Sequence, residues 1–130
     1  MKIVKYNVCY GDSDQMGIVY YANYLKIFEY ARMKFLHEIN MTYLELEKRD
    51  IYMPIIEAHV EYKQPALVED VLLIELWPNN IKRASLRFDY IIRRKDIILT
   101  RGYTRHACIG KNKKPKRIPN DIINGLVENG

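Results

Sequence analysis

The segment from Tyr24 to Ile39 is apolar around most of a helical turn, and this feature constrains the fold more than any other. Its apolar residues recur at the i, i+4, i+7 and i+11 spacing of one helix face: Tyr24, Phe28, Ala31 and Phe35. Further apolar residues widen that face: Leu25, Ile27, Leu36 and Ile39. Because a helix with so wide an apolar face cannot lie on a surface, we expect a sheet to wrap around it.

Segments rich in β-branched and aromatic residues lie on both sides of this helix in the sequence. They predict strands over Lys2–Tyr10, Tyr52–Tyr62, Val68–Trp77, Ile81–Arg94 and Ile97–Ile109. Short helices are predicted over Thr42–Arg49 and from Pro119 to Gly125 or just beyond. A meander of antiparallel strands after one dominant helix indicates an α+β fold, with residues 1–130 as a single domain. The free edges and open second face of such a sheet predict self-association, as a dimer or tetramer.

A polar turn precedes the long helix. The run from Gly11 to Gly17 contains two acids and two glycines in seven residues, which suits neither a helix interior nor a central strand. It holds a carboxylate close to a helix N-terminus, where backbone N–H groups lack intrahelical partners. Two interpretations fit this pattern: a reaction site, or a simple turn and cap in which Asn23 satisfies the first amides.

The sequence from Tyr10 to Tyr24, YGDSDQMGIVYYANY, resembles the signature of the hotdog-fold acyl-CoA thioesterases of the 4-hydroxybenzoyl-CoA thioesterase and YbgC type. The resemblance implies a curled antiparallel sheet around one long central helix. It also implies hydrolysis of acyl-CoA thioesters to free acid and CoA. One position departs from the pattern: many YbgC-type members have histidine where this chain has Tyr21.

The resemblance assigns roles to particular residues. Asp14 occupies the place of the catalytic acid, as a general base or a nucleophile, and the backbone amide of Tyr21 would polarise the thioester carbonyl. Gly17 belongs to the same motif, on the substrate side. Met53, Pro54 and Ile55 would line the channel for the pantetheine arm, and Lys82, Arg83, Ala84 and Ser85 would hold the phosphates of coenzyme A. Asp12 is better suited to holding the turn.

The net charge of +5 and the pI near 9.1 favour an anionic partner. Five of the seven residues from Lys111 to Arg117 are basic, but no RNA-binding motif accompanies them, which disfavours nucleic acid. The alternatives to an acyl-CoA substrate are an acyl carrier protein thioester and a non-catalytic basic module that binds acyl groups or RNA. A hotdog dehydratase is a further rival, although its catalytic His and Glu pattern is not found.

The remaining reactive residues do not suggest a second centre. Cys9 and Cys108 are expected to be buried, reduced thiols, and the three histidines, His37, His59 and His106, are scattered. We therefore expect no metal, and no cofactor apart from the coenzyme A of the substrate. The absence of a membrane span or secretory signal predicts a cytoplasmic protein.

Overall fold

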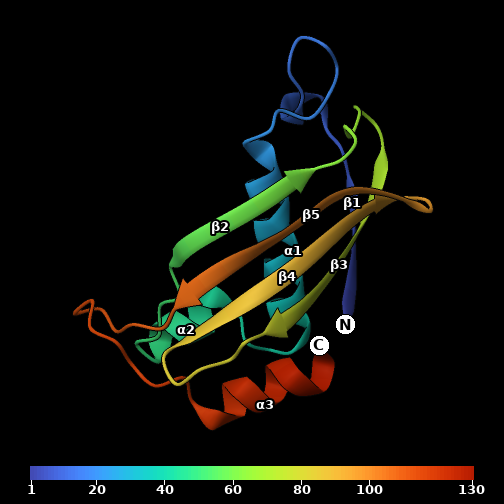
Figure 1. Cartoon of the computed structure of the whole chain (residues 1–130). Coiled ribbons are helices and arrows are strands. Elements are labelled where there is room, and N and C mark those ends of the chain that lie inside the picture. Colours follow the sequence, from blue (N-terminus) through green and yellow to red (C-terminus); the bar gives the residue numbers. More distant parts are fainter.

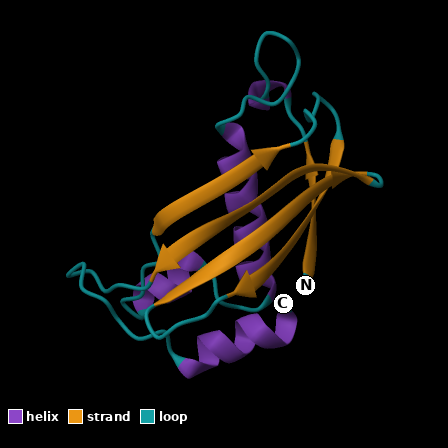
Figure 2. Cartoon of the chain, in the orientation of Figure 1, coloured by secondary structure: helices purple, strands orange, loops and turns teal.

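One antiparallel sheet curves around a central helix (Figure 1, Figure 2). The computed structural model describes residues 1–130. The strands are β1 (Lys2–Asn7), β2 (Ile55–Tyr62), β3 (Val71–Asn79), β4 (Ser85–Arg94) and β5 (Ile97–Ala107). The α-helices are α1 (Asn23–Glu38), α2 (Tyr43–Lys48) and α3 (Asn120–Asn129), and a 3-10 helix spans Tyr10–Asp12. This arrangement confirms the α+β hotdog fold that the sequence predicts.

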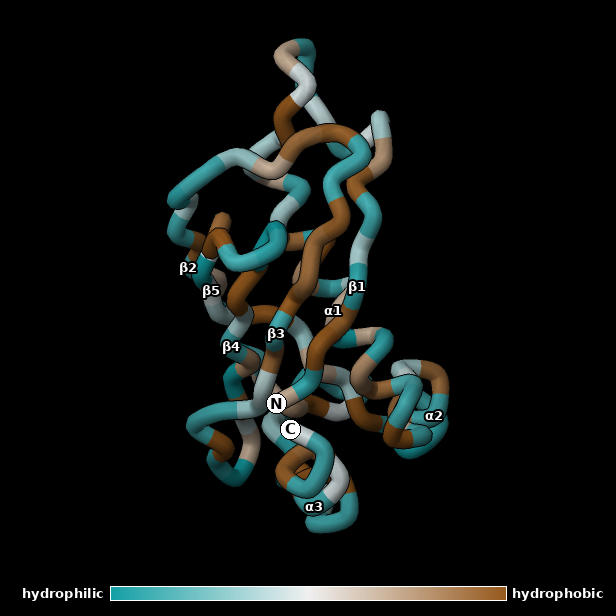
Figure 3. The backbone as a smooth tube through the Cα atoms, turned by 90° about the vertical axis from the view of Figure 1, so that its right-hand side faces the viewer, coloured by the Kyte–Doolittle hydropathy of each residue, from teal (hydrophilic) through white to brown (hydrophobic).

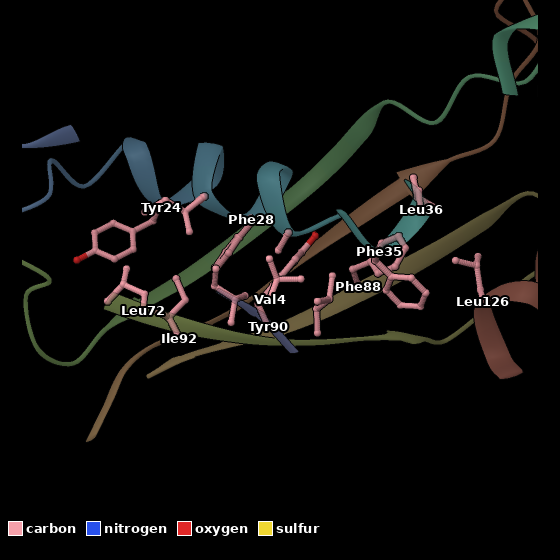
Figure 4. Close-up of a cluster of buried hydrophobic side chains, with 14 of the residues drawn as sticks. Val4, Tyr24, Phe28, Phe35, Leu36, Leu72, Phe88, Tyr90, Ile92 and Leu126 are labelled. Atoms are coloured by element: carbon pink, nitrogen blue, oxygen red, sulfur yellow. The ribbon is translucent and has the colours of Figure 1, made fainter. Parts of the chain in front are cut away.

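Helix α1 packs its apolar face on the sheet and forms the centre of the core. Figure 4 shows Tyr24, Phe28 and Phe35 pointing toward side chains of the strands. The ring of Phe28 stacks on Tyr90 of β4 with ring centroids 4.0 Å apart. Gly102 of β5 allows this approach, because a Cβ there would lie 2.9 Å from the Phe28 ring.

The residues of β3 and β4 alternate between the core and the outer face of the sheet, as their period of two predicts. In β4 the inward residues are buried: Leu86, Phe88, Tyr90 and Ile92. The residues between them carry charge on the outer face, where Arg87 pairs with Asp89 at 3.1 Å and Arg93 with Glu75 at 3.0 Å. The outward positions of β4 are therefore largely charged, and α1 covers only the inner face of the sheet.

The order of strands differs from a simple meander. The order across the sheet is β1-β3-β4-β5-β2, so β3, β4 and β5 are consecutive neighbours while β2 lies at the far edge beside β5. Strands β1 and β2 are the two edges. In β2 every residue except Val60 is exposed.

Several element boundaries differ from the sequence prediction. Residues 81–84 form a loop rather than the start of β4, and Pro78 and Asn79 complete β3 instead of forming a turn. Helix α3 continues through Gly125 to Asn129. Glycine suits position 125 because it leaves room for Met41: a Cβ there would lie 2.6 Å from the Met41 Cε. At the start of α1 the N-cap is Ala22, not Asn23.

Both cysteines are free, and one prediction about them is wrong. Cys108 is buried as expected, whereas Cys9 is exposed because β1 ends at Asn7 and Cys9 already belongs to the loop that follows. Helices α2 and α3 lie together at the end of the molecule opposite that loop (Figure 1, Figure 3). Arg49 at the end of α2 and Asp121 at the start of α3 form a two-bonded ion pair, with N to O distances of 2.8 and 2.9 Å.

Candidate active site

Asp12 fixes the loop between β1 and α1. Only 4% of it is exposed, and its Oδ2 accepts hydrogen bonds from the Tyr6 hydroxyl at 2.7 Å and the Cys9 backbone at 2.9 Å. Its backbone oxygen accepts from the Asn23 side chain at 2.9 Å and from the Tyr20 amide at 3.0 Å. Burial, followed by the Asp12 carboxylate, raises the pKa of Tyr6, so the Tyr6 hydroxyl stays protonated and remains a donor. Asp12 thus holds the turn through its Oδ2 and its backbone oxygen.

Asp14 has a different environment. Its Oδ1 accepts the Met16 amide at 2.7 Å, its backbone N–H donates to Ile18 at 2.8 Å, and its Oδ2 has no partner. Gly17 closes this turn with a φ of 76°, in the left-handed region that glycine adopts without strain. The turn therefore holds the carboxylate in position and leaves one oxygen free to react.

The backbone amide of Tyr21 lies at the entry to α1 and has no hydrogen-bond acceptor in the protein. No side chain caps this helix, since the Asn23 side chain donates to Asp12 instead. The carbonyl oxygen of Tyr21 accepts the Tyr62 hydroxyl at 3.0 Å, which fixes the local backbone. An unpaired N–H at the N-terminus of a 16-residue helix is a donor ready for an anionic or polarised oxygen.

Asp14 and Tyr21 line the same hollow, which we call the Asp14 hollow. It has a volume of about 430 Å³ and is lined by Asp14, Ile18, Val19, Tyr20, Tyr21, Tyr24, Tyr62, Lys63, Gln64 and Pro65. Gly17 is not among these residues. The residues from Tyr62 to Pro65 could not be identified from the sequence, because they form the last residue of β2 and the segment after it, about 40 positions away from the motif. They reach the site because β2 ends beside the start of α1 (Figure 1).

The other residues assigned by resemblance lie together at the opposite end of the sheet. The Pro54 carbonyl accepts the Ala107 amide at 3.1 Å, and the Ala84 carbonyl accepts the Cys108 amide at 2.8 Å. Pro54 and Ala84 therefore flank the same short segment, about two strand spacings or 10 Å apart. From Ile55 to Tyr62, strand β2 covers about 23 Å. Within one chain, Met53–Ile55 and Lys82–Ser85 therefore lie away from Asp14 by roughly the length of this strand.

Each of these two groups borders a hollow of its own. Met53 and Pro54 line the Met53 hollow, about 510 Å³ in volume, with Tyr43, Glu47, Ile51, Tyr52, Ile109, Gly110, Lys111 and Lys113. The Lys82 hollow, about 660 Å³, is lined by Ile81, Lys82, Arg83, Arg117, Ile118, Ile123 and Val127. No carboxylate lines the Lys82 hollow. The sequence analysis did not assign Arg117 to this site.

The histidines do not converge on Asp14. His37 and His59 are exposed, whereas His106 is buried between the Thr104 hydroxyl at 2.8 Å and the Met53 carbonyl oxygen at 3.0 Å. Burial lowers the pKa of His106 to about 4, so its ring is neutral at pH 7. No group of three or more His, Cys, Asp or Glu side chains is arranged to hold a metal ion. None of the helices has both the length and the hydrophobicity needed to cross a membrane.

The curled sheet, its enclosed helix and the Asp14 turn define a hotdog-fold thioesterase-type domain, and comparison with known proteins agrees. The model of the thioesterase-like superfamily matches residues 8–126, and the chain belongs to this family. It is 31% identical to a putative esterase of Aquifex aeolicus, covering 97% of this chain and 98% of that protein. It is 30% identical to the acyl-CoA thioesterase YbgC of Haemophilus influenzae, with 88% of this chain and 86% of that protein covered.

A solved structure shows the same architecture. The crystal structure of a hypothetical protein from Aquifex aeolicus superimposes with a TM-score of 0.92 at 28% identity, covering 97% of this chain and 99% of that one. The family assignment agrees with the resemblance noted in the Tyr10–Tyr24 segment.

Proposed function

We propose that this protein hydrolyses acyl-CoA thioesters to a free acid and CoA. The observation that carries the proposal is that a carboxylate with a free oxygen, that of Asp14, lines one hollow with the unpaired backbone amide of Tyr21. A thioester needs little more than a base or nucleophile and a donor for its carbonyl oxygen. Family membership and the acyl-CoA thioesterase among the relatives support this reaction and this carrier.

Asp14 performs the reaction by one of two routes. As a general base it takes a proton from water while the water oxygen attacks the carbonyl carbon, and the C–S bond then breaks to release the CoA thiol. As a nucleophile its oxygen attacks that carbon and expels the thiolate, and water then hydrolyses the resulting anhydride. In both routes the Tyr21 amide donates to the oxyanion, an interaction worth about 3 kcal/mol in the transition state.

The working site requires two chains. The open edge of β2 carries apolar side chains at Ile55, Ile56, Ala58 and Val60 and pairs with no strand on its outer side. Antiparallel pairing with β2 of a second copy, around a twofold axis near Ala58, brings Ile55 of one chain beside Tyr62 of the other. That pairing joins the Asp14 hollow of one protomer to the Met53 hollow of its partner. We therefore propose a homodimer as the minimal active unit.

Coenzyme A extends across this junction. The pantetheine arm passes Met53, Pro54 and Ile55 of the chain opposite the reacting Asp14, and the phosphates reach Lys82 and Arg83 of that same chain. Neither of these two basic side chains has an ion-pair or hydrogen-bond partner within the protein, and both are exposed. Arg117, which lines the same hollow, is equally free to contribute.

A panel of thioesters with a thiol reagent tests this function. Wild-type protein is offered short, long and aromatic acyl groups on coenzyme A and on acyl carrier protein, and we expect thiol release from CoA esters. Asp14→Asn should reduce the rate of thiol release by about 100-fold or more. The unfolding temperature should be unchanged, because the amide oxygen of the variant can still accept the Met16 N–H. Thiol release from the acyl carrier protein thioesters alone would show that the substrate is an acyl carrier protein thioester and not an acyl-CoA. Release from no ester would leave a non-catalytic binding module.

A further inference from the structure

Tyr24 is the only buried residue with a polar side chain among those that line the Asp14 hollow. Only 2% of it is exposed, and its hydroxyl oxygen accepts the Ala66 amide at 3.2 Å. The Ala66 carbonyl oxygen in turn accepts the Val19 amide at 2.8 Å, at the end of the turn that holds Asp14. The backbone around the Tyr24 hydroxyl therefore fixes its position relative to this turn.

The proton of this hydroxyl has no acceptor in the protein. A tyrosine hydroxyl can donate one proton as well as accept, and the Ala66 amide engages only its accepting side. The neighbouring Tyr62 packs edge-on against Tyr24, with ring centroids 5.1 Å apart, but its own hydroxyl bonds to the Tyr21 carbonyl oxygen. Because a buried donor without an acceptor is costly, we expect Tyr24 to donate to a group that enters the hollow.

The direction of the Tyr24 side chain brings its hydroxyl to the reacting end of α1. Long side chains on a helix lean toward its N-terminus, over the preceding turn. Tyr24 is the second residue of α1, so its ring extends back toward the level of Tyr21, three residues earlier. Figure 4 shows this ring at the N-terminal end of α1, with its hydroxyl oxygen directed away from the rest of the core. The hydroxyl is therefore at the same end of the helix as the Tyr21 amide.

We propose that Tyr24 donates a hydrogen bond to the water that attacks the thioester, and that Asp14 acts on this water as a general base. The water oxygen accepts the Tyr24 O–H with one lone pair and attacks the carbonyl carbon with the other, while the free Oδ2 of Asp14 takes one of its protons. The C–S bond then breaks, and the proton on Asp14 passes to the leaving sulfur. Tyr24 keeps its own proton throughout. This inference rests on the proposed function and selects the base route from the two described there.

Tyr24→Phe tests the proposal, because it removes the hydroxyl and keeps the ring. We expect kcat to fall about tenfold with KM changed by less than about twofold, since the water loses its orientation while the substrate keeps its contacts. With hydroxylamine as a second nucleophile, the same ester yields a hydroxamate beside the free acid. The hydroxamate-to-acid ratio should rise about fivefold in Tyr24→Phe, because only attack by water uses the hydroxyl. This ratio does not depend on the fraction of the variant that is folded.

Tyr90→Phe is the control, since it also removes a buried tyrosine hydroxyl but lies on β4 outside the Asp14 hollow, and it should leave the ratio unchanged. An equal ratio in wild type and Tyr24→Phe, or a rise in KM alone, would overturn the proposal. A rapid release of one thiol per active site by Tyr24→Phe before steady turnover would also overturn it, because that burst requires attack by Asp14 itself. These results leave the proposed function intact, whereas no thiol release by wild type would overturn both.

Discussion

The hydroxyl of Tyr62 donates to the carbonyl oxygen of Tyr21 at 3.0 Å and so joins the end of β2 to the entry of α1. This bond fixes the peptide backbone at the residue whose N–H we propose as the oxyanion donor. The same bond links the edge strand β2 directly to the start of α1, next to the Asp14 turn.

Removal of this bond should affect kcat more than substrate binding. In Tyr62→Phe we expect kcat to fall about fivefold with KM nearly constant, because the Tyr21 amide loses its fixed orientation. Steady-state kinetics on the best ester of the panel measures this. Tyr103→Phe is the matched control, since its hydroxyl donates to Glu57 on the outer face of the sheet. An equal loss in both variants would argue against an orienting role.

The two acids of the turn should separate stability from chemistry. Asp12→Ala leaves the Tyr6 hydroxyl and the Cys9 amide without an acceptor, and we expect it to cost about 2–4 kcal/mol of unfolding free energy. Asp14→Ala removes a single bond at the surface and should cost less than about 1 kcal/mol. Urea denaturation of both variants compares the two. A larger loss for Asp14→Ala would contradict our account of the turn.

The buried His106 should lower the unfolding free energy as the pH falls below about 6.5. Because burial lowers its pKa in the folded chain to about 4, well below the usual 6.5, the unfolded chain binds a proton first as the pH falls. Its contribution is complete above about pH 6.5 and is lost between pH 6.5 and pH 4, by up to about 3 kcal/mol. Urea midpoints across this interval should decline less steeply in His106→Gln. Parallel curves for the two proteins would refute the assignment.

Two inactive variants should restore activity to each other. If each site combines Asp14 of one chain with Lys82 and Arg83 of the other, a mixed dimer of Asp14→Asn and Lys82→Glu/Arg83→Glu contains one intact site. Statistical mixing after joint refolding then recovers about one quarter of wild-type activity at low substrate concentration. Each variant refolded alone is the control. Recovery near zero, with mixed dimers verified by mass, would show that each chain builds its own site.

The sequence was sufficient for the central helix and its covering sheet, because both depend on local periodicity. The spacing of Tyr24, Phe28 and Phe35 follows one helix face, and alternation in β4 follows the pleat. The position of β2 was not predictable in this way. The residues of β2 themselves do not indicate that this strand pairs with β5 at the edge of the sheet and not with β3, the next strand in the sequence.

The candidate site divides along the same line. Asp14, Gly17 and Tyr21 lie in one continuous motif, so the resemblance could assign roles to all three. In the structure Asp14 and Tyr21 line one hollow and Gly17 does not. Tyr62 and Lys63 enter the Asp14 hollow only through the packing of β2 beside α1. The burial of Arg32 on α1, with hydrogen bonds to the hydroxyls of Tyr43 and Tyr90, likewise depends on residues distant in the sequence and could not be predicted from the helical pattern.

The separation of Asp14 from Lys82 by the length of a strand has a consequence for how the catalyst switches on. In the dimer proposed above, a single chain contributes part of each of two active sites, so one chain alone would hold no complete site. The specific activity should accordingly decline as the protein is diluted below the dissociation constant of the dimer. Activity would then depend on the association of two folded chains and not on folding alone.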